Sequence, residues 1–523
     1  MIAKLQAEER IREAQQGLGR PIISFQANDH RIVAVGNTVH YARNWKTFPD
    51  FLGDYLKQTL GREWGNEEIA KPLEQRHPLL QWYDAYCHYQ QRTIKTRGEV
   101  NAAEVTGVVA CYLGLAYSLY LLAHNVELQT RLVRRLKNIG TFQGAYYELI
   151  VANILIRAGF TLTLEDETDG DTKHCEFAAV SKKTGKRYWV EAKMRGVVGL
   201  LGKTDRDGTT NPNPISQLVP HLNAALKKPA ADERLIFIDL NTEAAFGLDA
   251  RPEWVTMAAA RLEQYEANEL DDAVQAYVFV TNMPFHRMLD SQLSIAGLPF
   301  GLGLPDFNRP GRYRLSEVYR RKLKHIDAHH IADALTKYGQ FPTTFDGGLP
   351  SEAFGGAARI MIGETYRFEN PGGDDFVGTV TAATVLESEK QAYISVTDQN
   401  GQSHIRTAPM SDAELADYKA HPDAYFGQVQ PVSRKTEDPY ELFEWMMEAN
   451  KGRSRESMLQ YFTTAPNLAE LQAMTDTDLL TEYCENLVAG ITSRFPVQQK
   501  VAPAGALGAT SGHGGQRTTH RRR

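Results

Sequence analysis

Hydrophobic residues change their spacing several times along the chain, and each change predicts a different kind of element. Up to residue 138 they recur at helical spacing, in stretches such as FPDFLGDYLKQTL and HPLLQWYDAYCHYQQRT, after one strand-like piece, RIVAVGNTVHYA. A further helical stretch, GAYYELIVANILIRAGF, ends at Gly159, where a glycine cap is expected. We therefore predict a mostly helical N-terminal region, residues 1–138, that leads into a domain of another type.

The next domain alternates between predicted strands and helices. TLTLEDE, HCEFAAV and KRYWVEAKMR predict three strands, and a KKTG turn joins the last two. A helix (ISQLVPHLNAALKK), a buried strand (RLIFIDLN), a second helix (EWVTMAAARLEQYEA) and a further strand (QAYVFVTN) follow. This α-β-β-β-α-β-α-β order predicts an α/β domain whose mixed sheet carries helices on its faces. With a basic helical extension, we place this domain at residues 139–345.

The remaining segments have weaker patterns. Glycine and proline in GLPFGLGLPDFNRPGRYR predict a loop, followed by one basic helix, SEVYRRKLKHIDAHHIADALTKYG. Short strands with PGG and QNG turns predict a small β-barrel or β-sandwich, a β-rich module within residues 346–435. Helical spacing returns over 436–495, and the Gly-rich tail, 496–523, is expected to be disordered.

Composition narrows the class of protein. The chain has 523 residues, 42% of them hydrophobic and 23% charged, which is typical of a globular protein with several domains. Its formal net charge of −6 excludes a polycation, so any nucleic-acid surface must be a local patch. The four cysteines are far apart, which argues against a disulfide framework or a zinc site. The first residues are amphipathic and charged, unlike a signal peptide, and we expect a cytoplasmic protein.

One uncharged segment is long enough to cross a membrane. Residues 105–123, VTGVVACYLGLAYSLYLLA, contain two glycines, a serine and three tyrosines, and no basic residue precedes them closely. The segment continues into a polar helical stretch. We favour a helix buried in a protein core and expect no membrane partner, with a membrane anchor as the alternative.

Two charges at the end of a predicted strand are the main candidates for chemistry. Glu191 and Lys193 project from the same face, because residues two apart on a strand do so. The neighbouring strand contributes Glu176, and the preceding helix contributes Glu148. Buried charges cost free energy unless they are paired or used. Clustered carboxylates suit Mg²⁺ or Mn²⁺, and the lysine could orient or deprotonate a water; the alternative is a solvated ion pair.

The same residues carry a family resemblance. HCEF, the KKTGK turn and YWVEAK resemble the core of the restriction-endonuclease-like PD-(D/E)XK nuclease superfamily, over about residues 140–282. The helix with YYEL that ends in IRAGF is similar to the first core helix of that superfamily. The resemblance implies metal-dependent cleavage of phosphodiester bonds. It matches Glu191 and Lys193 to the E-x-K pair, Glu176 to an acid that is usually aspartate, and Glu148 to a helix glutamate.

Other residues near this motif are weaker candidates. Gln217 resembles a glutamine that some members place near the site. Three acids of the loop before Glu176 could replace it as a metal ligand: Asp166, Asp169 and Asp171. His325 and His329 have the i, i+4 spacing of metal ligands on a helix but lack the glutamate of a zinc protease motif, so packing is the favoured interpretation.

Basic residues indicate where a substrate would lie. Those near the motif are Arg131, Arg134, Arg135, Lys137, Arg195 and Lys203, and a second cluster comprises Arg312, Arg314, Arg320, Arg321, Lys322 and Lys324. Such clusters can follow a phosphate backbone, although each residue alone is more typical of a solvated surface. We predict a nucleic-acid partner, DNA rather than RNA, in host defence or DNA processing by analogy with the superfamily. The alternatives are a non-catalytic module that binds nucleic acid or protein, and a homo-oligomer.

Overall fold

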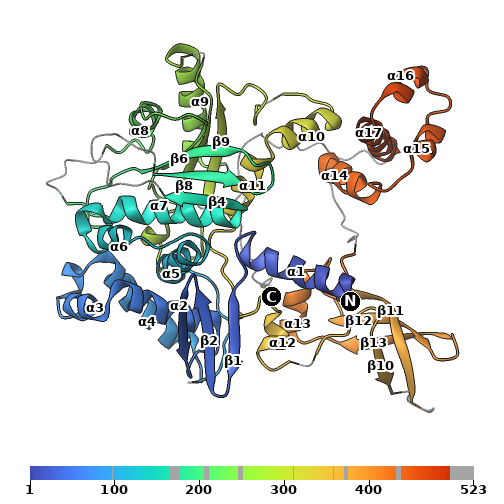
Figure 1. Ribbon diagram of the computed structural model, residues 1–523, viewed down its shortest axis with the longest axis horizontal. Coiled ribbons are helices and arrows are strands. Elements are labelled where there is room, and N and C mark those ends of the chain that lie inside the picture. Colours follow the sequence, from blue (N-terminus) through green and yellow to red (C-terminus); the bar gives the residue numbers. More distant parts are fainter. Residues whose placement is uncertain are drawn as a thin grey trace, which may run out of the picture. The chain divides into compact units, whose positions relative to one another are not determined.

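The computed structural model contains two compact units, whose elements are labelled in Figure 1. Unit 1 comprises Met1–Leu304 and His330–Val429, and unit 2 comprises Pro305–His329 and the C-terminal helices from Pro439 onward. The structure describes residues 1–96, 98–164, 176–204, 211–244, 251–271, 273–309, 311–356, 358–369, 375–430 and 438–494.

The N-terminal region is helical apart from one small sheet, as the sequence predicts. The strand-like piece forms part of an antiparallel sheet with the order β1-β2-β3. The elements are α1 (Ile2–Gln16), β1 (Ile23–Ala27), β2 (His30–Val35), β3 (Thr38–Ala42), α2 (Phe48–Leu60), α3 (Arg62–Ile69), the 3-10 turn Leu73–Gln75, α4 (Pro78–Thr93), α5 (Gly107–Asn125) and α6 (Thr130–Lys137).

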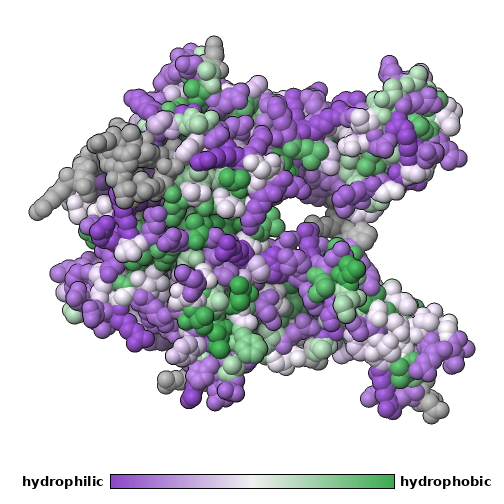
Figure 2. Space-filling model, in the orientation of Figure 1, coloured by the Kyte–Doolittle hydropathy of each residue, from purple (hydrophilic) through white to green (hydrophobic). Residues whose placement is uncertain are grey.

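One face of this small sheet is apolar and exposed. Cross-strand pairing aligns Ile23 with Ala34 and Val39, and Phe25 with Ile32 and Tyr41. The large side chains at the outer positions, Ile23, Phe25, Val39 and Tyr41, are between 57% and 69% exposed. Figure 2 shows hydrophobic side chains gathered over this part of the molecule.

The uncharged segment forms α5, which is surrounded by protein. Seventeen of its 19 residues are buried, and two described helices, α5 and α7, are long and apolar enough to cross a membrane by length and composition. Their apolar windows are 94% and 67% buried inside the protein. A helix that is apolar on all sides is expected in the core of a large protein, which is where α5 lies.

The central domain is built on a mixed six-stranded sheet with the order β4-β5-β6-β7-β8-β9. β4, β5 and β6 pair antiparallel, β6, β7 and β8 pair parallel, and β9 returns antiparallel to β8. The elements follow the predicted order up to β8: α7 (Ile139–Arg157), β4 (Phe160–Leu164), β5 (Phe177–Ser181), β6 (Arg187–Met194), α8 (Leu218–Leu226), β7 (Glu233–Asp239), α9 (Glu253–Asn268), β8 (Ala276–Asn282) and β9 (Ala296–Leu302). The predicted α/β domain with a mixed sheet is confirmed at this level.

Strand β9 corrects the prediction of a loop in this region. Its seven residues are all buried, although the sequence AGLPFGL contains two glycines and a proline. Pro299 lacks a backbone N–H, and β9 is the last strand in the order of the described sheet, the position where a proline is best tolerated. The glycines and the proline therefore indicated a loop where the sheet in fact has its last strand.

Helices cover both faces of this sheet. On one face α8 and α9 pack against alternate residues of β7 and β8, such as Ile236, Ile238 and Val278. On the other face α7 contributes Tyr147, whose hydroxyl lies 2.8 Å from that of Thr281 on β8. α7 ends at Arg157 with Ala158 as its C-cap, and Gly159 follows in the left-handed conformation (φ 89°). The sheet is thus covered by helices on both faces.

The β-rich module is one open sheet rather than the predicted β-barrel or β-sandwich. Its order is β10-β11-β12-β13, all antiparallel, and β10 does not pair with β13 over the described residues. Its inner face packs against α1, through Ala7 and Ile11, so a helix covers the apolar face that closure would otherwise bury. The elements are α12 (Pro350–Ala353), β10 (Thr365–Phe368), β11 (Phe376–Leu386), β12 (Gln391–Asp398), β13 (Ser403–Pro409) and α13 (Asp412–Ala420).

Unit 2 is helical and has its own core. Phe443, Met447, Leu479 and Val488 form part of that core, and Leu315 packs against it. The basic stretch predicted as one helix is two, because α10 ends at Lys324 and α11 begins at Ile326. The elements are α10 (Leu315–Lys324), α11 (Ile326–Thr336, shared with unit 1), α14 (Pro439–Ala449), α15 (Arg455–Tyr461), α16 (Leu468–Ala473) and α17 (Asp476–Arg494).

Candidate active site

Strand β6 brings Glu191 and Lys193 to one face, at the end where β5 stops pairing with it. Phe177 of β5 pairs with Val190, and Glu176 directly precedes Phe177. The backbone N–H of Glu176 donates to the carbonyl of Val190 at 3.0 Å, which holds Glu176 against β6. Both carboxylates therefore lie at the end of β6 that carries the lysine.

The three side chains are in direct contact. Lys193 Nζ lies 2.8 Å from Glu176 Oε1 and 3.0 Å from Glu191 Oε2. Lys228, which follows α8, reaches the same point: its Nζ lies 2.7 Å from Glu191 Oε1 and 3.7 Å from Glu176 Oε1. We call these four residues the carboxylate–lysine cluster. It contains two negative and two positive groups drawn from three separate elements.

Burial gives the cluster its electrostatic character. Glu191 is 1% exposed. Burial alone would raise the pKa of Glu176, but Lys193, Lys228 and Arg135 outweigh it and leave that pKa below its usual value. Burial likewise would lower the pKa of Lys193, but Glu176 and Glu191 outweigh it and raise that pKa. Glu176 is therefore ionised and Lys193 protonated near neutral pH.

Glu148 is held by an arginine next to this cluster. Arg135 of α6 donates two hydrogen bonds to its carboxylate, at 2.6 and 2.7 Å. Burial nevertheless raises the pKa of Glu148 to about 6, with Arg135 opposing the rise and the charge of Glu176 adding to it. Glu148, Arg135 and Glu176 line one small cavity. The helix glutamate is thus near the cluster, but its oxygens are engaged by Arg135.

Glu176 and Glu191 are the carboxylates of the cluster that could hold a divalent cation. Each oxygen of Glu191 already has an ammonium nitrogen close to it, Lys193 at 3.0 Å and Lys228 at 2.7 Å, so a cation would compete with both lysines. Mg²⁺ is often held by one or two carboxylates with water and phosphate oxygens. Among the described residues, no group of three or more His, Cys, Asp or Glu side chains could hold a metal ion together. Any metal here would depend on Glu176, Glu191, water and substrate.

Comparisons with known proteins add no family to this geometry. No family model, curated protein or solved structure matches the chain. The interpretation of the site rests on its own residues.

The predicted substrate-binding residues are in different environments. Arg195 is buried, and its guanidinium donates to the backbone carbonyls of Leu240 and Asn211 at 3.2 and 2.6 Å. It therefore holds loops together, which corrects its prediction as a substrate contact. Arg134 is exposed on α6 and makes no hydrogen bond or ion pair with another described residue, so its charge is free for a ligand.

Gln217 and Lys203 lie at the loop that follows β6. The side-chain oxygen of Gln217 accepts from the backbone N–H of Gly196 at 3.3 Å, and Lys203 Cε lies close to the same glycine. Both residues therefore support this loop.

The acids Asp166, Asp169 and Asp171 lie outside the described residues.

Five of the six cations of the second basic cluster form ion pairs within unit 2, and the sixth, Arg312, is exposed. Arg314 pairs with Glu482 and Glu485 at 2.8 Å, and the other pairs are Arg320–Asp478, Arg321–Glu317, Lys322–Glu444 and Lys324–Asp306. The pairs of Arg320 and Lys322 join α10 to α17 and α14, whereas Arg321–Glu317 lies within α10. The two candidate histidines pack around the ring of Phe307, at 5.2 and 5.7 Å, and His325 Nε2 lies 3.1 Å from Asp306. Packing explains both histidines.

Sequence reasoning missed two residues of the site. Lys228 is in the stretch LKKPA after a helix, where a lysine pair is typical of a solvated helix end. His221 of α8 is close enough to Lys193 for the two charges to repel, and burial and this lysine lower its pKa to about 4. Neither residue forms part of a spacing motif with β6. Only the folded sheet reveals that α8 and the residues after it lie over the strand end.

Proposed function

We propose that this protein is a metal-dependent nuclease that hydrolyses phosphodiester bonds of nucleic acid, with DNA as the favoured substrate. The observation that carries the proposal is the convergence of Glu176, Glu191 and Lys193 at the end of a buried strand, with N–O distances of 2.8 and 3.0 Å. Burying two carboxylates is costly, and their position at an open strand end suits a site better than a core. The order of elements from α7 to β8 also accords with a PD-(D/E)XK nuclease core.

The roles follow from the geometry. Glu176 and Glu191 would hold Mg²⁺ or Mn²⁺, which supplies Lewis-acid stabilisation of the phosphate charge when it is bound. Lys193 is protonated, so it would act first as a hydrogen-bond donor that orients the attacking water and neutralises charge on the phosphate. Its raised pKa disfavours the role of general base while both carboxylates face it.

Glu148 and Lys228 would act around this centre. Glu148 is held by Arg135, so it would support a water or the arginine rather than bind metal directly. Lys228 Nζ lies 2.7 Å from Glu191 Oε1, where it compensates the charge of the carboxylate. A divalent cation that binds Glu191 would therefore compete with the ammonium of Lys228.

A non-catalytic module is the second candidate function. One observation favours it: the two carboxylates and two ammonium groups already balance each other, as in a buried structural ion network. Such a module would bind DNA in a salt-sensitive manner without cutting it, and the binding would survive changes at Lys193 and Glu191.

Cleavage assays distinguish the two. Double-stranded DNA, single-stranded DNA and RNA are incubated with the full chain in Mg²⁺ or Mn²⁺, alongside Lys193→Ala and Glu191→Ala. We expect cleavage by the wild type and a loss of about 10²–10⁴-fold in Lys193→Ala, as for other groups that act on the reacting atoms. Metal-dependent cutting that is equal in all three proteins, or absent from all, would contradict the proposal.

A further inference from the structure

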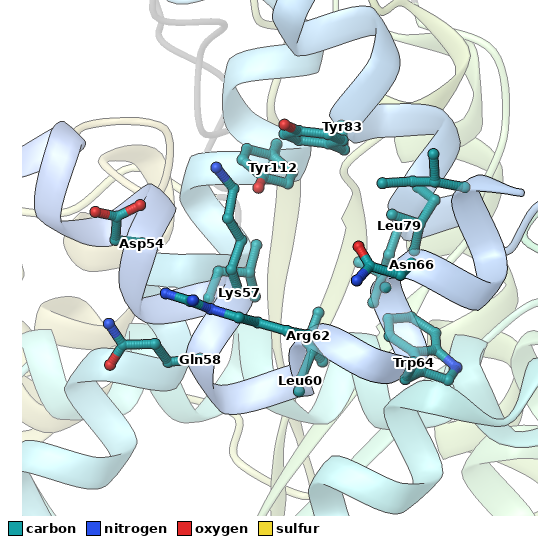
Figure 3. Close-up of a pocket in the computed structure, with 15 residues that line it drawn as sticks. Asp54, Lys57, Gln58, Leu60, Arg62, Trp64, Asn66, Leu79, Tyr83 and Tyr112 are labelled. Atoms are coloured by element: carbon teal, nitrogen blue, oxygen red, sulfur yellow. The ribbon is translucent and has the colours of Figure 1, made fainter.

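A second cavity lies in the N-terminal helical region, apart from the carboxylate–lysine cluster. Its volume is about 380 Å³, and it is enclosed by α2, α3, α4 and α5. No residue of the cluster lines it. Figure 3 shows Lys57 extending toward Tyr112 and Tyr83, while Trp64, Asn66 and Leu79 lie on the opposite side. Cavities of this size are typical of small-molecule sites.

The interior of this cavity is apolar and aromatic. Three rings line it, from Trp64, Tyr83 and Tyr112, and the rings of the two tyrosines lie 5.6 Å apart at 40°. Aliphatic side chains complete the surface: Leu56, Leu60, Ile69, Leu79 and Leu80. Burial raises the pKa of both tyrosines, so their hydroxyls remain neutral and do not repel an anion. Such walls suit a flat ring system.

The polar part of the lining has an excess of positive charge. Lys57 and Arg62 are exposed at the opening, and neither forms an ion pair with another described residue. The ammonium of Lys57 lies 5.2 Å from the centre of the Tyr83 ring. Asp54 is the one carboxylate in the lining, and its Oδ2 already accepts from the indole N–H of Trp45 at 2.8 Å. Two cations beside aromatic walls favour an anionic ligand.

We propose that this cavity binds a small planar anion, an aromatic ring system with one sulfonate, carboxylate or phosphate group. The ring lies between Trp64 and the two tyrosines, and the anionic group binds Lys57 and Arg62. The amides of Gln58 and Asn66 line the same cavity and supply further donors. The proposal concerns a ligand site and does not depend on the nuclease function.

Calorimetric titration of the full chain with 2-naphthalenesulfonate tests the charge requirement. We expect one site, and binding at least about tenfold weaker for the double variant Lys57→Gln/Arg62→Gln, because bonds to charged donors are lost. The uncharged analogue 2-naphthalenemethanol should also bind at least about tenfold more weakly to the wild type. Equal affinity for the two compounds, or no heat from the sulfonate at millimolar concentration, would overturn the proposal.

Two glycines provide a matched pair that tests the position of the site. A Cβ added to Gly65 of α3 or to Gly53 of α2 meets no atom within 4 Å, so a side chain can start at both positions without a clash at its Cβ. Leucine also favours a helix more than glycine does. Gly65 lines the cavity and Gly53 does not. Gly65→Leu should abolish binding of 2-naphthalenesulfonate and Gly53→Leu should preserve it; unchanged binding by Gly65→Leu would place the ligand elsewhere and refute the site.

Discussion

The carboxylate–lysine cluster and the cations of α10 use the same residue types in opposite ways. In the cluster, side chains from three elements meet at one point, and the side chain of Glu191 is 2% exposed. The side chains of Arg314, at the start of α10, and of Arg320 on it are 61% and 50% exposed, and both residues pair with carboxylates of α17. Charged residues therefore indicate a site only when burial and convergence accompany them.

The two groups of charges differ in energy because water hydrates the exposed pairs of α10 and is largely excluded from the cluster. In an exposed ion pair, each charge is already well hydrated when the pair is broken, so forming the pair adds little to the free energy of unfolding. A buried charge has no such hydration, and each partner removed leaves the others uncompensated. The α10 pairs therefore contribute little individually, whereas the charges of the cluster depend on one another because protein shields them from water.

Removing one carboxylate from each region should give the largest contrast. Glu191→Ala leaves two ammonium groups partly buried without their main partner, and we expect it to lower the free energy of unfolding by about 3–5 kcal/mol. Asp478→Ala, which removes the exposed partner of Arg320, should cost less than about 1 kcal/mol. Urea unfolding of both variants measures the difference. Comparable losses would show that the cluster is as well solvated as α10.

A pH titration sharpens the same comparison. Folding raises the pKa of Glu148 from its usual 4.5 to about 6, so the folded protein holds this proton more tightly than the unfolded chain. The associated stability is present below pH 4.5 and is lost as pH rises through 6, by roughly 2 kcal/mol. The free energy of unfolding of the wild type minus that of Glu148→Gln should fall accordingly between pH 4.5 and 7. A flat difference would show that Arg135 fully offsets burial.

A substitution of Lys228 should change the affinity of the cluster for a divalent cation, whereas a substitution of a lysine on α10 should not. Removing a positive charge 2.7 Å from Glu191 Oε1 favours a cation, so Lys228→Met should tighten Mn²⁺ binding by about tenfold. Lys322→Met, a matched change on α10, should leave it unaltered. Electron paramagnetic resonance of free Mn²⁺ measures both. Weaker binding by Lys228→Met would mean that this lysine supports the metal site instead of competing with it.

An arginine without an acidic partner should contribute more to DNA affinity than an arginine that is already in an ion pair. Arg134 has no described partner, so Arg134→Gln should weaken DNA affinity and reduce the slope of log affinity against log salt by about 1. Arg320 is already paired with Asp478, and Arg320→Gln should change the slope by less. Fluorescence anisotropy at several salt concentrations checks this. The reverse order would place DNA on unit 2.

Much of the fold could be predicted from the sequence because the local patterns agree with the tertiary structure. Periodicity located α7 and strands β4 to β8, and Gly159 follows the C-cap of α7. The prediction was wrong where the local sequence favours one structure and tertiary pairing imposes another. Pro299 and two glycines indicate a loop, yet pairing with β8 makes a buried edge strand. Helix α1, which covers the inner face of the β-rich module, ends at Gln16, whereas the first strand of that sheet begins at Thr365, so no local pattern could show that the module stays open.

The candidate site was predictable only in part. Glu191 and Lys193 are two apart on a strand, which fixes their common face, and Glu176 followed from the hairpin. Lys228 and Arg135 depend on how helices cross the sheet, and neither has a spacing relation to β6. Arg195 was placed wrongly because a basic residue after a motif looks exposed, whereas its guanidinium satisfies buried carbonyls.

The most direct test of the central claim compares Lys193 with a lysine of α10. The initial rate of nicking of supercoiled DNA in Mg²⁺ is measured for the wild type, Lys193→Ala and Lys322→Ala. The account predicts that Lys193→Ala loses at least about 10²-fold while Lys322→Ala retains the wild-type rate. Nicking by Lys193→Ala at the wild-type rate would contradict a catalytic role for the carboxylate–lysine cluster.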